Sequence, residues 1–268
     1  MDMNDPKSVD VGNVWWFWFT TSAFTVDKKL RHVMRVLPHD PRCKFCNAPF
    51  QGVGGTIVRV LFGKQRSSLN PRFCNLCDQA SRQFPGGAEV PMSMLFADVR
   101  GSTALSETMK AMEFRQVINR FYTASTKVIA DEDGLLEKLA GDSVAAFWGS
   151  GFAGPDYVRR TIRVAQKLSS VMEQQRIPVG IGVHAGIAFF GAMGTAEGLT
   201  DISAIGEEVN LAARLASKAL AGEIIVSEQA LKEAGVDGSP FESRSLELKG
   251  ITGPVQARVL SGREQDRL

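Results

Sequence analysis

From Val90 towards the C-terminus, short apolar runs alternate with segments that carry apolar residues at helical spacing. Met92–Asp98 is such an apolar run and predicts a buried strand, whereas residues 156–174 predict an amphipathic helix. Residues 135–148 predict two strands joined by a tight turn at 140–142. Further strands are predicted at 179–190, 224–227, 243–249 and 255–260. Further helices are predicted at 103–130 and 207–221. This mixture predicts an α/β fold, an α+β sandwich in which helices cover a sheet.

The part of the chain before Val90 has a different character. Residues 28–82 are rich in Lys and Arg, contain many turn-forming Gly, Pro and Asn residues, and hold all the cysteines. Pro85-Gly86-Gly87 follows and is typical of a linker. We therefore predict three parts, namely a leader at 1–27, a small module at 28–85 and a larger domain at 88–262.

The four cysteines form two Cys-x-x-Cys pairs, Cys43 with Cys46 and Cys74 with Cys77. We find no secretion signal and expect the reducing cytoplasm, where such pairs bind metals more often than they form structural disulfides. Two such pairs favour a tetrahedral structural zinc site, which would stabilise a module that has few large apolar residues. An iron–sulfur cluster and reversible disulfides are the alternatives.

The leader contains the most apolar run of the chain, residues 14–24. This run has about half of the roughly 20 residues that a membrane-spanning helix needs, and it lacks the flanks of a signal peptide. It predicts an aromatic strip that packs on the body or on a partner, and membrane contact is the less favoured alternative. The net charge of +2 gives no overall field for nucleic acid, and the basic residues of the module are scattered, so no nucleic-acid partner is expected.

Two aspartates stand at predicted strand ends. Asp98 ends a strand directly before the turn Val99-Arg-Gly-Ser-Thr103, and Asp142 lies in the tight turn between two strands. Paired carboxylates of this kind can hold two Mg²⁺ or Mn²⁺ ions, an arrangement that suits phosphoryl chemistry. In the turn, Gly101, Ser102 and Thr103 offer backbone N–H groups at a helix N-terminus, which suits phosphate. Taken singly, each aspartate is more typical of an ordinary turn or helix cap.

Four segments that carry such residues occur in order along the chain. They are Phe96-Ala-Asp-Val-Arg-Gly-Ser-Thr103, Glu137-Lys-Leu-Ala-Gly-Asp142, Gly182-Val-His-Ala-Gly186 and Ala204-Ile-Gly-Glu-Glu-Val-Asn-Leu-Ala-Ala-Arg214. Together they closely resemble the class III adenylyl/guanylyl cyclase catalytic domain over about residues 90–261. The resemblance implies a ferredoxin-like βαββαβ core, here preceded by the small metal-stapled module.

The resemblance implies roles in metal and triphosphate binding. Asp98 and Asp142 match the paired metal ligands, and the carbonyl of Val99 adds a backbone ligand. Two Mg²⁺ or Mn²⁺ ions per site are implied, one to activate the ribose 3′-hydroxyl and both to neutralise the triphosphate. Lys249 matches a further triphosphate contact.

The resemblance also implies how the nucleoside is recognised. Lys138 matches the base-recognising lysine of adenylyl cyclases, and Ser203 occupies the second base-selecting position, where those enzymes usually carry Asp or Thr. Asn210 matches the residue that orients the ribose, and Arg214 the one that stabilises the pentavalent phosphate. Family members that prefer GTP usually carry Glu and Cys at the two base-selecting positions, so ATP is the expected substrate. The Ser203 hydroxyl can both donate and accept, which leaves GTP as a side activity.

Three other polar positions have structural interpretations. A histidine within the strand, His184, is more typical of a core or interface than of a catalytic base. Asp201 lies two residues from the base-selecting position and is interpreted as structural. Glu207 and Glu208 suit the positive end of the helix dipole.

The expected function is therefore an adenylate cyclase, a phosphorus–oxygen lyase that forms 3′,5′-cyclic AMP and diphosphate from ATP. In the family, the metal aspartates of one subunit face the lysine, asparagine and arginine of the other. One chain with the whole set predicts a symmetric homodimer with two shared sites. The alternatives are a guanylate cyclase, a catalytically silent cyclase-like nucleotide-binding regulatory module, and a zinc-dependent nucleic-acid-binding protein that uses the cyclase fold to dimerise.

Overall fold

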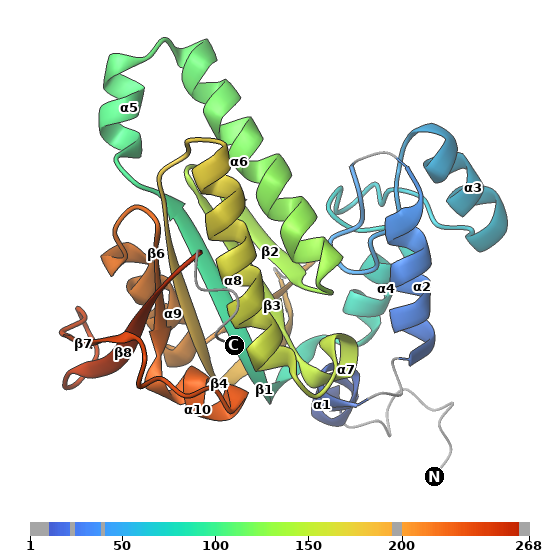
Figure 1. Ribbon diagram of the computed structural model, residues 1–268. Coiled ribbons are helices and arrows are strands. Elements are labelled where there is room, and N and C mark those ends of the chain that lie inside the picture. The colour runs from blue at the N-terminus through green and yellow to red at the C-terminus, as the bar shows by residue number, and fades with distance from the viewer. Residues whose placement is uncertain (1–10, 22–24, 39–40, 195–199, 263–268) are drawn as a thin grey trace. The chain divides into compact units, whose positions relative to one another are not determined.

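A computed structural model describes residues 11–21, 25–38, 41–194 and 200–262 of the chain (Figure 1). The helices are α1 (Val11–Thr20), α2 (Thr25–Val36), α3 (Gly52–Phe62), α4 (Asn75–Gln83), α5 (Ser102–Thr108), α6 (Ala111–Asp131), α7 (Ser150–Ala153), α8 (Tyr157–Gln174), α9 (Glu207–Lys218) and α10 (Glu228–Ala234). The strands are β1 (Gly86–Val99), β2 (Leu135–Ala140), β3 (Ser143–Trp148), β4 (Val179–Gly194), β5 (Thr200–Ile205), β6 (Glu223–Ser227), β7 (Glu242–Leu246) and β8 (Val255–Ser261).

These elements fall into two compact units. The first unit contains Met1–Val90, Ser150–Phe152 and Phe189–Ile205, so it combines the N-terminal part with the paired residues of β4 and β5. The second unit contains Pro91–Gly149, Ala153–Ala188 and Gly206–Leu268.

One mixed sheet runs in the order β2-β3-β1-β4-β6-β8-β7, with β5 paired to β4. β1 is antiparallel to β3, and β4 is parallel to β6. The order β1-α6-β2-β3-α8-β4 along the chain confirms the predicted βαββαβ core. Within the second unit, α6 and α8 pack against each other and against strands of this sheet (Figure 1).

The core of the second unit follows from the apolar pattern. Val144–Trp148 of β3 is buried along its whole length, as a central strand requires. α8 buries one stripe of small and aliphatic side chains, Val158, Ile162, Ala165, Leu168 and Met172. Gly134, directly before β2, admits the Trp148 indole, because a Cβ atom there would lie 2.5 Å from the ring.

Two boundaries differ from the sequence prediction. Gly86 and Gly87 do not form a linker but begin β1. Their lack of a side chain serves a close backbone approach, since a Cβ atom at Gly87 would lie 2.4 Å from the carbonyl oxygen of Phe190. The helix predicted over 103–130 is broken into α5 and α6, and α6 begins where the Glu113 carboxylate accepts the backbone N–H of Lys110 at 3.3 Å.

Residues 14–20 of the aromatic strip predicted at 14–24 lie in α1 and pack within the first unit, whereas residues 22–24 lie outside the described part of the chain. Trp15 and Phe19 are buried, and the Trp15 indole donates to the carbonyl of Phe84 at 3.0 Å. Their rings lie 5.8 Å and 4.6 Å from the ring of Phe190. The packing prediction is therefore confirmed for these two residues. Among the described residues, none of the helices combines the length and apolar character needed to cross a membrane.

Candidate active site and cysteine cluster

Asp98 and Asp142 are brought together by the pairing of β1 with β3. The antiparallel register sets Asp98 opposite Ser143, the residue after Asp142. The Val99 N–H donates to the carbonyl of Asp142 at 2.9 Å, which fixes the end of β1 against the turn. That turn needs Gly141, whose φ of +61° is in the left-handed region.

The charges around this pair are incompletely compensated. The Arg100 guanidinium forms an ion pair with one oxygen of Asp98, and the Ser102 hydroxyl donates to Asp142. The other oxygen of Asp98, Oδ1, is buried and has no hydrogen-bond partner in the described part of the chain. Burial raises the pKa of the Asp98 carboxyl, Arg100 lowers it, and the nearby Asp142 carboxylate raises it again.

These features fit a divalent cation. The Asp142 carboxylate lies close enough to Asp98 to raise the pKa of the Asp98 carboxyl, and Oδ1 of Asp98 is buried without a donor. A hard cation takes oxygen ligands of this kind and would relieve the repulsion between the two carboxylates. The donor set of Asp98 and Asp142, with the adjacent Val99 carbonyl, therefore suits Mg²⁺ or Mn²⁺.

A groove of about 410 Å³ adjoins the Asp142 turn. Ser102 and Thr103, at the start of α5, line it together with Gly141 and Asp142. Gly101 precedes α5 with a φ of +67°, and no atom lies near the position that its Cβ would take. The backbone turn is thus open on this side.

The other predicted residues of the second unit lie elsewhere. Lys138 is exposed on β2, whereas Asn210 and Arg214 lie one turn apart on α9. No hydrogen bond in the described chain joins any of these three to Asp98 or Asp142. Nε of Arg214 is buried and lacks a hydrogen-bond partner among the described residues.

Lys249 lies in the loop beside Arg214. A Cβ atom at the next residue, Gly250, would be 3.4 Å from the Arg214 guanidinium. Lys249 itself is exposed and borders a groove of about 480 Å³ that Lys218 also lines. This loop and α9 therefore present three cationic side chains in one region of the second unit.

Ser203 belongs to the first unit. It lies on β5, opposite Gly191 of β4. Its neighbour Asp201 accepts from Lys44 at 3.0 Å and forms an ion pair with Arg72 at 2.7 Å. Asp201 thus has the structural role that its position predicts.

Two polar arrangements had no signal in the sequence. One is the pairing of Arg100 with Asp98, described above. The other joins His184 of β4 to Ser227 at 2.7 Å through Nδ1 and to the Glu208 carboxylate through Nε2. Burial lowers the pKa of His184, although Glu208 opposes this effect. A neutral ring that donates from Nε2 and accepts at Nδ1 satisfies both partners, so the histidine holds α9 to β4 as part of the core.

The four cysteines of the first unit form one cluster. Their sulfur atoms lie within 4.8 Å of one another, and those of Cys46 and Cys74 are 3.7 Å apart. Four sulfurs around one zinc ion at 2.3 Å would be separated by about 3.8 Å. Backbone N–H groups of Cys74 and Cys77 donate to the sulfurs of Cys43 and Cys74, at 3.2 Å and 3.4 Å.

The pKa values of the four clustered thiols shift in both directions, because burial raises that of Cys43 and hydrogen bonds with the other three raise that of Cys77, whereas those of Cys46 and Cys74 are lowered. Hydrogen bonds from Cys43, Cys74 and Cys77 lower the pKa of the Cys46 thiol. Burial lowers the pKa of Lys64, but the neighbouring cysteine sulfurs outweigh this effect and raise it. The cluster can therefore hold a metal ion, with a cation beside it.

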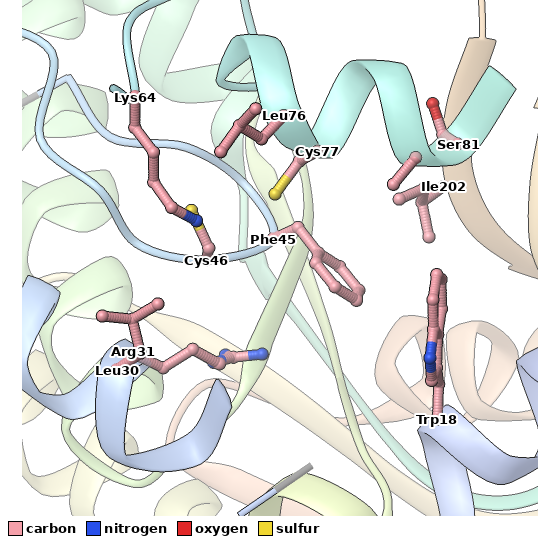
Figure 2. Close-up of a pocket in the computed structure, with 11 residues that line it drawn as sticks. Trp18, Leu30, Arg31, Phe45, Cys46, Lys64, Leu76, Cys77, Ser81 and Ile202 are labelled. Carbon is pink, nitrogen blue, oxygen red and sulfur yellow. The ribbon is translucent and has the colours of Figure 1, made fainter. Parts of the chain in front are cut away.

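The cluster forms one wall of a cavity within the first unit. Figure 2 shows Phe45, Cys46 and Cys77 bordering this cavity together with Trp18 of α1 and Ile202 of β5. Its volume is about 190 Å³, and most of its lining is apolar.

Residues 88–261 match the family model described as the adenylate and guanylate cyclase catalytic domain. Rv1320c of Mycobacterium tuberculosis is 31% identical over 225 residues, which make up 78% of this chain and 38% of that protein. An adenylate cyclase of Anabaena cylindrica is 28% identical over 174 residues, or 59% of this chain and 34% of that protein. The chain thus spans little more than a third of the length of these relatives.

Solved structures of both substrate classes share the fold. The crystal structure of the guanylyl cyclase Cya2 matches with a TM-score of 0.60 and 25% identity, over 65% of this chain and 93% of that chain. The adenylyl cyclase CyaB from P. aeruginosa matches with a TM-score of 0.56 and 27% identity, over 65% of this chain and 96% of that chain. The mixed α/β fold is therefore that of a cyclase catalytic domain.

Proposed function

Because this chain belongs to the family of adenylate and guanylate cyclase catalytic domains, we propose that it converts ATP to 3′,5′-cyclic AMP and diphosphate. The observation that carries this proposal is the Asp98–Asp142 pair. Two carboxylates at adjoining strand ends, with a buried oxygen that lacks a donor, suit the cations that accompany a nucleoside triphosphate.

In this reaction the ribose 3′-oxygen forms a bond to the α-phosphorus, and the bond from that phosphorus to the bridging oxygen breaks. The 3′-hydroxyl loses its proton and diphosphate leaves. Asp98, Asp142 and the Val99 carbonyl would hold two Mg²⁺ or Mn²⁺ ions, which when bound lower the pKa of the hydroxyl and neutralise phosphate charge.

The remaining residues bind and orient the substrate. Backbone N–H groups of Gly101, Ser102 and Thr103, at the N-terminal end of α5, would bind phosphate oxygens of the substrate. Asn210 orients the ribose, and Arg214 stabilises the negative charge that develops on the α-phosphate. Lys249 adds a positive charge for the triphosphate. The partnerless Nε of Arg214 supports a role in which its guanidinium gains a ligand.

We infer that the active site is shared between two copies of this chain. Oδ1 of Asp98 and Nε of Arg214 are both buried without a hydrogen-bond partner in the described chain, and the proposed reaction uses both residues. A homodimer would bring the Asp98–Asp142 pair of one subunit to the Asn210 and Arg214 of its partner, and would do so twice by symmetry.

ATP is the proposed substrate because Lys138 and Ser203 stand at the base-selecting positions. The serine hydroxyl can accept as well as donate, so GTP is expected as a slower substrate. Incubation with Mn²⁺ and either ATP or GTP, followed by identification of the products, tests this. A faster reaction of GTP than ATP would make the chain a guanylate cyclase instead.

Complementation tests the shared site. Asp98→Ala and Arg214→Ala should each abolish product formation. An equal mixture of the two chains gives heterodimers in about half of the dimers, each with one intact site, so activity should return to about one quarter of the wild-type value. Heterodimers that form without any recovery of activity would contradict shared sites, and full activity of either variant alone would contradict its assigned role.

We also propose that the four cysteines hold one structural zinc ion. The sulfur separations support tetrahedral Cys₄ coordination, which stabilises small modules. Elemental analysis of the purified chain should find one zinc per chain. Substantially less metal, with four titratable thiols, would contradict this proposal.

A further inference from the structure

Two loops, one with Cys43 and Cys46 and one ending at Cys74, both bind β5, the strand that carries Ser203. They are called the cysteine loops below. Lys44 lies between Cys43 and Cys46, and its ammonium donates to the Asp201 carboxylate at 3.0 Å and to the carbonyl of Ile202 at 2.6 Å. The Lys44 side chain is only 5% exposed, whereas that of Asp201 is 37% exposed, so the contact is shielded from water at the lysine. One loop of the cluster thus holds β5 directly before Ser203.

The second cysteine loop contacts the same segment of β5. Arg72, two residues before Cys74, forms an ion pair with the second oxygen of Asp201 at 2.7 Å. Asn70 donates its side-chain amide to the carbonyl of Thr200 at 2.6 Å. Asp201 is therefore held between one cation from each loop.

The cysteine cluster itself joins these two loops. The backbone N–H of Lys44 donates to the carbonyl of Arg72 at 2.8 Å, and the sulfurs of Cys46 and Cys74 lie 3.7 Å apart. These contacts already hold the two loops side by side, and a metal bound by all four sulfurs would add folding free energy to the same arrangement. A metal on the cysteines would therefore strengthen the spacing of Lys44 and Arg72.

We propose that a zinc ion on the four cysteines fixes β5 through Lys44 and Arg72, and that Asp201 is the positioning residue through which zinc sets the substrate preference conferred by Ser203. This inference rests on the proposed function, because only a cyclase would use Ser203 to select a base. Zinc would then stabilise the position of β5 as well as the fold of the N-terminal module. Its loss would loosen one strand of the catalytic region.

Three variants test this coupling. Lys44→Met and Asp201→Asn remove the ion pair between the first cysteine loop and β5 but keep all four cysteines, whereas Cys46→Ser removes a zinc ligand. Arg59→Met is the matched control, since it removes an exposed cation from α3 of the same module. Each purified chain is measured for zinc content, for hydrogen exchange of peptides covering 200–205, and for kcat/KM with ATP and with GTP.

Lys44→Met and Asp201→Asn should keep one zinc per chain, exchange faster in 200–205, and lose about tenfold in ATP-over-GTP preference, which corresponds to a change of about 1.4 kcal/mol. Cys46→Ser should lose zinc and show the same two changes, and Arg59→Met should match the wild type. Unchanged exchange in both Lys44→Met and Cys46→Ser would overturn the proposal, as would faster exchange with an unaltered preference.

The outcomes separate this inference from the proposed function. If the wild-type chain forms no cyclic nucleotide from either substrate, the proposed function fails, and with it the link from β5 to base selection. If the wild type is active but loss of zinc or of Lys44 leaves exchange and preference unchanged, the coupling alone fails. Retention of zinc by Lys44→Met excludes a merely unfolded module as the cause of its changes.

Discussion

Replacing Gly182 with alanine probes how closely α9 approaches the sheet. A Cβ atom at Gly182 of β4 would lie 2.2 Å from the backbone nitrogen of Ala216 and 2.6 Å from the carbonyl oxygen of Ala212. Heavy atoms in favourable contact are about 3.5 Å apart. Because both neighbours belong to the helix backbone, the helix itself would have to move by about 1 Å to admit the methyl group.

Two consequences can be measured. Overpacking of this kind costs about 1–3 kcal/mol, and each kcal/mol lowers the Tm of a chain of this size by about 2–4 °C. The same helix carries Asn210 and Arg214, and a misplacement of about 1 Å can lower a reaction rate by about 100-fold. We expect Gly182→Ala to lower both the Tm and kcat/KM for ATP, the latter by far more than the loss of folded protein explains.

Gly238→Ala is the matched control. A Cβ atom there would lie 3.2 Å from Cδ1 of Leu231 and 3.4 Å from Cγ of Arg258, which are side-chain atoms that can shift. Thermal unfolding and Mn²⁺-dependent kinetics of both variants are compared with the wild type. A Gly182→Ala chain that melts and reacts like the wild type would refute the close approach. A lowered Tm with normal kinetics would refute the positioning of the catalytic pair by this contact.

Three further outcomes follow from single contacts. Arg100→Met should lower the Mn²⁺ concentration for half-maximal activity about fivefold, because the guanidinium neutralises Asp98 and competes with a cation there. A titration of activity with Mn²⁺ checks this, and an unchanged or higher Mn²⁺ requirement would contradict it. Glu223→Gln should cost about 1 kcal/mol at pH 7, measured by urea unfolding. Arg244 lowers the pKa of Glu223 in the folded chain, so the ion pair stabilises the fold above the unfolded-state pKa of about 4.3, and this stabilisation is lost as the pH falls through the lower folded-state pKa. The variant should lose this dependence of the unfolding free energy on pH, and the same pH dependence in variant and wild type would argue against the pair. Ser203→Thr should raise the kcat/KM ratio of ATP over GTP severalfold, because the added methyl group restricts the hydroxyl rotamers, and a lower ratio would speak against base selection at this position.

The sequence predicted the parts of the fold that depend on local pattern. The tight turn at 140–142 and most of the strands and helices predicted from Val90 onward are confirmed, because apolar period and turn residues act within a few positions, but β5 (Thr200–Ile205) was not predicted and the helix over 103–130 is broken in two. The close pairing of Asp98 with Asp142 in the structure follows from the same signals, since both lie at strand ends. The family resemblance assigned roles to residues whose surroundings no periodic pattern could reveal.

Long-range contacts are the part that could not be predicted. Gly86 and Gly87 match a linker in composition, and only the approach of Phe190 makes them strand residues. The partners of Asp201 lie 157 and 129 positions earlier in the chain, where nothing in their own segments marks them as its neighbours. The pairing of Arg100 with Asp98 depends on rotamers that packing selects.

The grip of the cysteine loops on β5 has a consequence for the order in which the chain folds. The loops emerge from the ribosome early, but their contact with Asp201 spans 157 positions, so it waits until most of the catalytic region has been synthesised. Until then the cysteine loops have been synthesised, but the Asp201 carboxylate that Lys44 binds has not. Contacts that close so long a loop are slow to form, so the two cysteine loops complete their contacts with β5 late, although they are made before it.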